Sequence, residues 1–266
     1  MTDFKILDCT LRDGSYVNRF QFSIHETKYI CAELEKCGLE HIEVGHGLGL
    51  GAYKLGGEYS AAASDEEYLT AASDALKKSH FGTFCIPGIA TIEDIDIANQ
   101  YGMRLIRIGT NVDAVESSKP YVERAKKYGM TVCANYMKSY SVPPREFAKK
   151  VKISESYGVD VIYLVDSAGG MLPSEVESYI TAIKEASGIK IGFHGHNNLG
   201  LAVANSLKAI EMGAYFVDCS LQGLGRSGGN APTEQFVLIT SKLGHKNNID
   251  IFRLLDLSFD TILDRK

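Results

Sequence analysis

Short runs rich in β-branched and aromatic residues alternate with longer amphipathic runs along the whole chain, and this alternation limits the possible folds more than any other feature. The short runs predict strands at residues 4–9, 41–45, 82–86, 105–108, 131–136, 161–165, 190–193 and 215–219. The amphipathic runs predict helices at residues 24–37, 64 onward, 92–101, 113–128, 144–157, 174–186, 199–212 and 233–243, with a last helix at about 249–264. Two pairs, Ser64 with Glu67 and Ser174 with Glu177, have the spacing of helix-capping boxes.

Glycine follows most of the predicted helices, as expected where a left-handed residue ends a helix before the next strand. The positions are Gly38, Gly102, Gly129, Gly158, Gly188, Gly213 and Gly244. Eight βα units in 266 residues predict the α/β class and a (β/α)₈ TIM barrel with an extra C-terminal helix. We expect one catalytic domain over residues 1–266, because no change in composition marks a linker. A doubly wound open sheet is the alternative architecture.

Composition narrows the classes of partner and compartment. The formal net charge is -5 and the chain has no lysine- or arginine-rich stripe, which argues against nucleic acid as a partner. No apolar run approaches the ~18 residues of a membrane span, and the N-terminus lacks the layout of a signal peptide. The six cysteines include no C-x-x-C pair, which favours buried thiols in a reducing compartment. We therefore expect a cytoplasmic protein.

Polar and ionisable residues follow most of the predicted strands, at the end where barrel enzymes carry their chemistry. In chain order they are Asp8, Thr10, Arg12, Asp13, Glu43, His46, Asn135, Lys138, Asp166, Ser167, His194, His196, Asn197, Ser220, Gln222, Arg226 and Asn230. Because all strands of such a barrel point the same way, these side chains are expected to converge at one mouth.

His194 and His196 lie two residues apart, so on an extended strand both side chains face the same side. Two imidazoles so placed can bind one divalent metal ion, although two hydrogen-bonded histidines at a strand end would give the same pattern. Asp13 is the natural third ligand. This set of nitrogen and oxygen donors fits Mg²⁺ or Mn²⁺, and Zn²⁺ or Co²⁺ could substitute. Open positions on the ion could take a 2-oxo acid, whose enolate the ion would stabilise as a Lewis acid.

Arg12, next to Asp13, offers a fixed positive group to the same developing oxyanion. The alternative is an ion pair of Arg12 with Asp8 or Glu43 that only braces the barrel mouth. Two glycine-rich segments, residues 45–51 and 223–230, contain no P-loop or dinucleotide motif. We interpret both as rim loops, the second as a mobile loop that closes over a site.

Three motifs together resemble the metal-dependent lyase superfamily of (β/α)₈ barrels, which includes HMG-CoA lyase, isopropylmalate and homocitrate synthases, and 4-hydroxy-2-oxovalerate aldolase. They are Thr10-Leu-Arg-Asp-Gly-Ser15, His194-Gly-His-Asn-Asn198 and the segment from Gly223 to Asn230. The resemblance to the catalytic domain of the aldolase is greatest, through Ile42-Glu-Val-Gly-His-Gly47, Pro87-Gly88, Asp166-Ser-Ala-Gly-Gly-Met171 and Gly229-Asn-Ala-Pro232. It extends over roughly residues 4–240.

The resemblance implies that Asp13, His194 and His196 bind the metal, with Asn230 in a metal-shell position. It also implies that Arg12 stabilises the pyruvate enolate and that Ser167 contacts the substrate carboxylate. Glu43 and Asn135 are further substrate-binding candidates because they follow strands at the same mouth. The small-molecule partners would then be a 2-oxo acid and an aldehyde.

Two departures from the aldolase pattern affect these expectations. The aldolases carry a histidine base directly after Arg-Asp-Gly-Ser, where this chain has Tyr16. A tyrosine with its ordinary pKa near 10 is a poor base at neutral pH, so either Arg12 or the metal lowers that pKa or His46 serves instead. The aldolases also continue into a helical domain that docks a dehydrogenase, whereas this sequence stops at Lys266, so a dehydrogenase partner is not supported unless the chain is a fragment.

The leading hypothesis is a divalent-metal-dependent aldolase, a carbon–carbon lyase acting on a 2-oxo acid of the 4-hydroxy-2-oxovalerate type. The alternatives are a Claisen-type acyl-CoA condensing enzyme or an HMG-CoA-lyase-like enzyme, and a metal-binding barrel whose active site has degenerated. The apolar residues of the last predicted helix either pack on the barrel or form a contact in a homo-oligomer; they are Leu254, Leu255, Leu257, Phe259 and Ile262.

Overall fold

The computed structural model describes residues 3–263, with side chains described through residue 261, and within them eight parallel strands close into a barrel in sequence order. The strands are β1 (Lys5–Asp8), β2 (His41–Glu43), β3 (His80–Cys85), β4 (Leu105–Asn111), β5 (Thr131–Met137), β6 (Val161–Asp166), β7 (Lys190–Gly195) and β8 (Phe216–Cys219). β8 pairs with β1, which closes the sheet. The predicted TIM barrel is therefore confirmed, and the open sheet is excluded.

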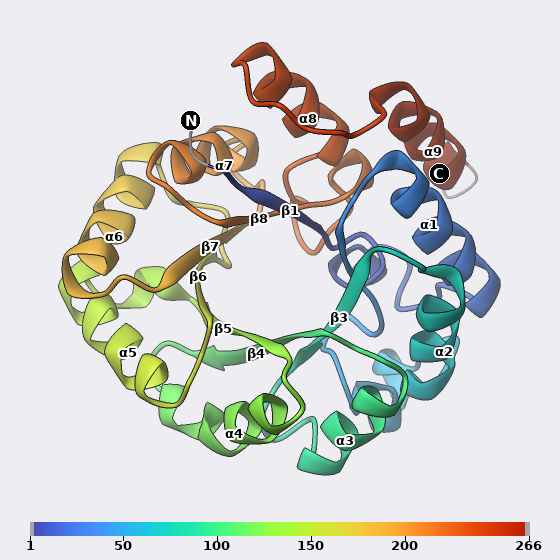
Figure 1. Ribbon diagram of the computed structural model, residues 1–266, viewed down its shortest axis with the longest axis horizontal. Coiled ribbons are helices and arrows are strands. Elements are labelled where there is room, and N and C mark those ends of the chain that lie inside the picture. Colours follow the sequence, from blue (N-terminus) through green and yellow to red (C-terminus); the bar gives the residue numbers. More distant parts are fainter. Residues whose placement is uncertain (1–2, 264–266) are drawn as a thin grey trace.

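Helices surround the barrel as an outer ring (Figure 1). They are α1 (Ile24–Cys37), α2 (Asp65–Ala75), α3 (Ile92–Gln100), α4 (Lys119–Lys127), α5 (Pro144–Ser156), α6 (Pro173–Ala186), α7 (Ala202–Glu211), α8 (Thr233–Lys242) and α9 (Ile251–Leu263). Apolar side chains from the outer faces of the strands and the inner faces of the helices form the main core. No described helix is long and apolar enough to cross a membrane.

The ends of the helices follow their sequence signals in most places. The capping box predicted at Ser64 and Glu67 is present, and Gly38 ends α1 with a φ of 97°, a left-handed conformation that glycine adopts without strain. The box predicted at Ser174 and Glu177 is wrong. The N-cap is Leu172, two residues earlier than predicted, so the helix starts at Pro173 and Glu175 accepts a hydrogen bond, 2.8 Å long, from the backbone N–H of Leu172.

Two predicted helix starts are also wrong. The helix predicted from residue 113 begins as a 3₁₀ turn at Val115–Ser118 and becomes α4 only at Lys119, next to Pro120, which suits the first turn of a helix. The helix predicted from Leu199 begins at Ala202, because Asn197 and Asn198 form a loop that packs on neighbouring loops instead.

The C-terminal helix α9 lies outside the ring, beside α1 and α8 (Figure 1). Leu254 and Leu257 are buried against the body of the protein, as intramolecular packing predicts, whereas Leu255 and Phe259 are exposed. The predicted range reached residue 264, which lies outside the described residues, as does the side chain of Ile262.

Inside the barrel, apolar side chains form one cluster, and a polar layer lies beyond it on several strands. The apolar cluster contains Leu7, Leu105, Cys133, Val161, Tyr163, Val165 and Phe216, and on β6 it extends up to Val165, which pairs with His194. Since inward-facing residues alternate along a strand, the next inward positions are two residues further on. These include Arg107 after Leu105, Asn135 after Cys133, and Asp218 after Phe216, and all three are buried. The polar layer therefore lies toward the carboxyl ends of the strands.

Candidate metal centre and active site

Three side chains meet at the carboxyl ends of β1 and β7. Asp13 starts a 3₁₀ turn, Asp13–Tyr16, after β1; His194 lies in β7, and His196 follows that strand. All three side chains are buried, and one potential ligand atom from each lies within 4.8 Å of the other two. The convergence predicted for these residues is therefore present, at a spacing that one metal ion can bridge.

Hydrogen bonds fix which nitrogen each imidazole presents to the centre. Nδ1 of His194 lies 2.8 Å from Oδ2 of Asp218, and Nδ1 of His196 lies 3.2 Å from the carbonyl oxygen of Gly229. Both partners can only accept, so we assign the proton of each ring to Nδ1, which leaves Nε2 with a free lone pair. A metal ligand held by a hydrogen bond on its other nitrogen is the usual arrangement for histidine.

The electrostatics of the centre favour the protonation states that a cation requires. Burial alone would raise the pKa of Asp13, but Arg12 and the two imidazoles outweigh it and hold that pKa well below its usual range. Burial, with the neighbouring His194, lowers the pKa of His196 to about 4. At neutral pH Asp13 is thus ionised and His196 neutral, and these are the forms that bind metal.

Asn230 completes the donor set. Its Nδ2 donates to Oδ2 of Asp13 at 2.8 Å and to the carbonyl oxygen of Leu224 at 3.0 Å, while its Oδ1 is buried without a partner among the described residues. An unpaired buried carbonyl oxygen beside a carboxylate and two imidazoles suits a hard or borderline divalent cation. The residues present therefore fit a divalent metal ion.

Arg12 joins the metal ligands to the opposite side of the barrel. Its Nε donates to Oε2 of Glu43 at 2.8 Å and its Nη1 donates to Oδ1 of Asp13 at 2.8 Å. Of the two partners suggested by the bracing alternative, Glu43 is the one observed, whereas Asp8 accepts from Thr10 and Thr233 instead. Nη2 of Arg12 has no acceptor in the described part of the chain, so one edge of the guanidinium remains for a ligand.

Sequence reasoning missed two residues of this centre, Arg107 of β4 and Asp218 of β8. Nη1 of Arg107 donates to Oε2 of Glu43 at 2.7 Å, and Nη2 donates to Oδ2 of Asp218. β4 and β8 are not neighbours, so the contact crosses the interior of the barrel. The signal was available, because each is a charged residue at an inward position of an otherwise apolar strand.

These contacts form one continuous series of buried groups, which we call the central ion-pair chain. Its members, in order of contact, are His194, Asp218, Arg107, Glu43, Arg12 and Asp13. The chain begins at one potential metal ligand and ends at another. Burial alone would raise the pKa of Asp218, but Arg107 and then His194 hold it below its usual value, so this carboxylate is charged at neutral pH.

The predicted substrate-binding residues lie around the same mouth. Asn135 is buried and its Oδ1 has no partner among the described residues; Oε1 of Glu43 is likewise unpaired. The hydroxyl oxygen of Ser167 accepts a 2.9 Å hydrogen bond from the backbone N–H of Lys138, which joins the ends of β6 and β5. Three predicted residues thus offer polar atoms at the mouth.

Tyr16 and His46 pack in an aromatic cluster with Phe20 at the rim. The centroids of the rings of Tyr16 and Phe20 are 5.0 Å apart, and those of Phe20 and His46 are 3.9 Å apart. Burial raises the pKa of Tyr16, although Arg12 opposes this shift, so the expected lowering by Arg12 does not prevail. His46 uses both nitrogens: Nδ1 accepts from Leu48 N–H, and Nε2 lies 3.0 Å from the carbonyl oxygen of Tyr59.

The glycine-rich segment 223–230 folds directly onto the metal centre. The backbone N–H of Arg226 donates to Oδ2 of Asp13 at 3.3 Å, and the carbonyl oxygen of Gly229 accepts from Asn197 N–H at 2.9 Å. A Cβ on Gly225 would lie 2.8 Å from Oδ2 of Asp13, so glycine is needed for this approach. The segment forms part of the rim, as predicted; its mobility remains a prediction.

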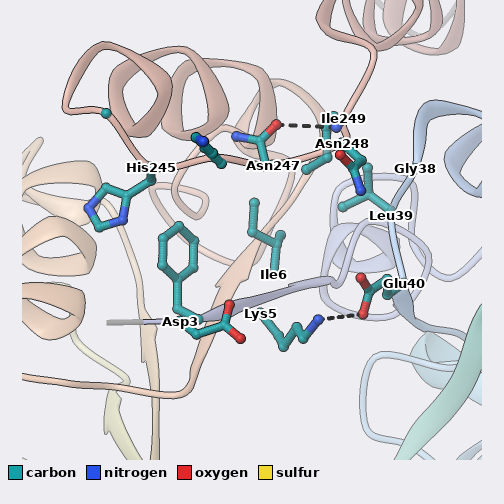
Figure 2. A pocket seen from close by; sticks show the side chains of 13 residues that line it. Asp3, Lys5, Ile6, Gly38, Leu39, Glu40, His245, Asn247, Asn248 and Ile249 are labelled. Carbon is teal, nitrogen blue, oxygen red and sulfur yellow. Dashed lines mark hydrogen bonds and ion pairs between the residues drawn. The ribbon is translucent and has the colours of Figure 1, made fainter. Parts of the chain in front are cut away.

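A separate cavity of about 520 Å³ lies at the other end of the barrel, between the start of β1 and the segment joining α8 to α9 (Figure 2). Lys5 and Glu40 form an ion pair across it, and His245 faces Phe4. In this fold, chemistry occurs at the carboxyl ends of the strands, so the amino-terminal cavity is not the candidate active site.

The barrel and its mouth together define a class: a TIM barrel whose carboxyl-terminal face carries a candidate Asp-His-His metal site with an adjacent arginine. Residues 3–260 match the family described as HMGL-like, and the chain belongs to this family. It is thus an enzyme of the lyase class, and the resemblance seen in the sequence is confirmed.

Curated relatives at higher identity are aldolases. The chain is 40% identical over 260 residues to the 4-hydroxy-2-oxovalerate aldolase of Carboxydothermus hydrogenoformans, covering 97% of the chain and 76% of the relative. It is 41% identical to that of Pelotomaculum thermopropionicum, with 98% and 76% covered. The HMG-CoA lyase of Bacillus subtilis superposes with a TM-score of 0.82 at 20% identity, covering 97% of this chain and 92% of that one, and this likeness shows the fold alone.

Proposed function

We propose that this protein is a divalent-metal-dependent aldolase that cleaves a 4-hydroxy-2-oxo acid to a smaller 2-oxo acid, pyruvate, and an aldehyde. The observation that carries the proposal is the placement of Arg12 against Asp13, next to two buried histidines with free Nε2 atoms. Relatives about 40% identical over nearly the whole chain are named 4-hydroxy-2-oxovalerate aldolases, which supports this substrate type.

Asp13, His194, His196 and Asn230 would hold the metal, and Mg²⁺ or Mn²⁺ fits the oxygen and nitrogen donors. When bound, the ion would supply Lewis-acid polarisation of the 2-oxo group. The free Nη2 edge of Arg12 would donate to the oxygen that becomes negative as the carbon–carbon bond breaks. That guanidinium is already held by two carboxylates, so it needs no rearrangement during the reaction.

The substrate carboxylate would be bound at the ends of β5 and β6. The hydroxyl of Ser167 can donate to it while its oxygen still accepts from Lys138 N–H. Asn135 and Glu43 offer buried acceptors, Oδ1 and Oε1, that have no partner among the described residues. The amide oxygen of Asn135 can accept a hydrogen bond from a substrate hydroxyl, and the carboxylate of Glu43 can take the proton that the 4-hydroxyl releases. Binding the two ends of the substrate in this way would orient the bond to be cleaved.

For proton transfer, we propose that Tyr16 acts as a proton donor rather than a base. With its pKa raised by burial, the phenol keeps its proton at neutral pH and can donate it to the enolate carbon left when the carbon–carbon bond breaks, which completes pyruvate. We assign His46 a structural role, because the hydrogen bonds at both of its nitrogens leave no lone pair for a substrate proton.

We further propose that residues 1–266 act as one catalytic domain in the cytoplasm. The six cysteines are free and buried, which suits a reducing compartment. The exposed Leu255 and Phe259 of α9 are compatible with a homo-oligomer. The chain spans about three quarters of the length of its curated relatives.

The test measures the exchange of the methyl protons of pyruvate for deuterium in D₂O. The reaction is stopped with a chelator, and the loss of the methyl signal is read by NMR. We expect exchange with Mg²⁺ or Mn²⁺ and none after metal removal. Asp13→Asn and His194→Ala should abolish both exchange and metal binding, whereas His25→Ala, on the exposed face of α1, should retain both. Full metal-dependent exchange in Asp13→Asn would refute the assignment of the site.

A further inference from the structure

We infer that Arg107 is a positioning residue: one guanidinium, at the centre of the barrel, fixes His194 on one side and Arg12 on the other. The catalytic part of this inference rests on the proposed function, while its metal-binding part does not. Arg107 is fully buried and touches neither the metal ligands nor the mouth directly, so it would act only through its two carboxylate partners.

The two arms of Arg107 reach two different parts of the site. Nη1 donates to Oε2 of Glu43, and the same oxygen receives Nε of Arg12 at 2.8 Å. Nη2 donates to Oδ2 of Asp218, and the same oxygen lies 2.8 Å from Nδ1 of His194. Because a guanidinium is planar and its N–H groups point in fixed directions, it sets the separation of Glu43 and Asp218.

The surrounding barrel is shaped to hold this guanidinium. Its central carbon lies 4.5 Å from the centroid of Tyr163 and 5.8 Å from that of Phe84. Each ring packs against a glycine of the neighbouring strand, where a larger residue would not fit: Tyr163 against Gly192, and Phe84 against Gly109. A Cβ on Gly192 would lie 2.5 Å from Cε2 of Tyr163, and one on Gly109 would lie 2.3 Å from Cζ of Phe84. Glycine weakens a strand interior, so these two positions indicate a requirement for the rings that flank Arg107.

Stability alone does not account for the central ion-pair chain. Removing charges from water is costly, and replacing buried ion pairs by apolar residues is often neutral or stabilising. Other inward-facing side chains of the barrel are apolar, among them Leu105, Cys133 and Phe216. The carboxylates that Arg107 holds also contact Arg12 and His194, which indicates a role in the site.

The experiment compares Arg107→Lys with a matched control, Arg124→Lys, which changes a part-exposed ion pair on α4. Lysine keeps the charge but cannot bridge Glu43 and Asp218 as a fork. We expect Arg107→Lys to weaken Mn²⁺ binding in calorimetry about 10-fold and to lower kcat about 100-fold with little change in KM, in the range known for groups that orient metal ligands. Arg124→Lys should change neither quantity by more than twofold.

Two further variants test the contact with Asp218 and the contact with Glu43 separately. They also test the inference if Arg107→Lys does not fold. Asp218→Asn should weaken Mn²⁺ binding about 10-fold through His194, and Glu43→Gln should lower kcat while leaving the Mn²⁺ affinity within threefold. A folded Arg107→Lys protein with wild-type Mn²⁺ affinity and kcat would overturn the inference, as would unchanged values in both single-arm variants. A wild-type protein that binds Mn²⁺ but leaves pyruvate unexchanged would refute the proposed function and leave the metal-binding comparison intact.

Discussion

The substitution Gly225→Ala, which adds one methyl group, tests the geometry of the candidate metal centre. Its φ is not in the left-handed region, so its backbone accepts alanine, and only space excludes a side chain. A Cβ at this position would lie 2.3 Å from Nδ2 of Asn230 and 2.8 Å from Oδ2 of Asp13. Both atoms belong to buried side chains, so the methyl group must displace Asn230, the loop, or both.

The magnitude follows from the bond that is lost. Nδ2 of Asn230 donates to the charged Oδ2 of Asp13 at 2.8 Å. A hydrogen bond to a charged group contributes about 1.5–3 kcal/mol. Since about 1.4 kcal/mol corresponds to a tenfold change in Kd, Gly225→Ala should weaken metal binding roughly 10- to 100-fold.

The assay is a calorimetric titration with Mn²⁺, with thermal unfolding of the metal-free proteins as the check on folding. Gly170→Ala is the matched control, because a Cβ on Gly170, in the loop after β6, would meet nothing within 4 Å. We expect the control to bind Mn²⁺ as the wild type does. If Gly225→Ala folds normally and its Kd stays within twofold of the wild type, the proposed contact between the loop and the metal centre is refuted.

Two other predictions concern ionisation. Burial, and after it the neighbouring His80, lowers the pKa of His41 from an ordinary 6.5 to about 4. As the pH falls, His41 is therefore protonated in the unfolded state before it is protonated in the folded state. The free energy of unfolding should therefore be at its full value above about pH 6.5 and fall toward pH 4 by up to roughly 3 kcal/mol more than in His41→Asn. Urea unfolding at pH 7, 5.5 and 4.5 measures this difference, and parallel losses in both proteins would contradict it. Tyr16→Phe should lower kcat about 100-fold if the phenol donates a proton. Steady-state kinetics with Mn²⁺ test this, and full activity of the variant would remove Tyr16 from the mechanism.

The fold and the clustering of the candidate metal ligands could be predicted because both depend on local patterns. Strand and helix periods, with glycine after most helices, are read within a few residues, and strand direction in a barrel then brings all carboxyl ends together. Asp13, His194 and His196 are adjacent to strands and carry the donor chemistry. Helix starts were less predictable, since Ser174 has a capping spacing but Pro173 already begins the helix.

The interior of the barrel was harder to predict because its contacts join strands distant in sequence. Arg107 and Asp218 lie 111 residues apart, and only the closed barrel brings them together. The pKa of Tyr16 depends on how deeply the phenol is buried, which the sequence does not show. Burial outweighs the nearby Arg12 and raises the pKa of Tyr16. His46 looked like a free base in the sequence, but hydrogen bonds from Leu48 and to Tyr59 occupy its ring.

The central ion-pair chain has a consequence for the order in which ligands reach the site. The three carboxylates of Asp13, Glu43 and Asp218 face two guanidinium groups, which leaves one negative charge buried at the mouth. A singly charged 2-oxo acid is repelled by this charge, and a divalent cation reverses its sign. We therefore expect metal to enter before substrate, in which case raising the concentration of the 2-oxo acid would not replace a missing ion.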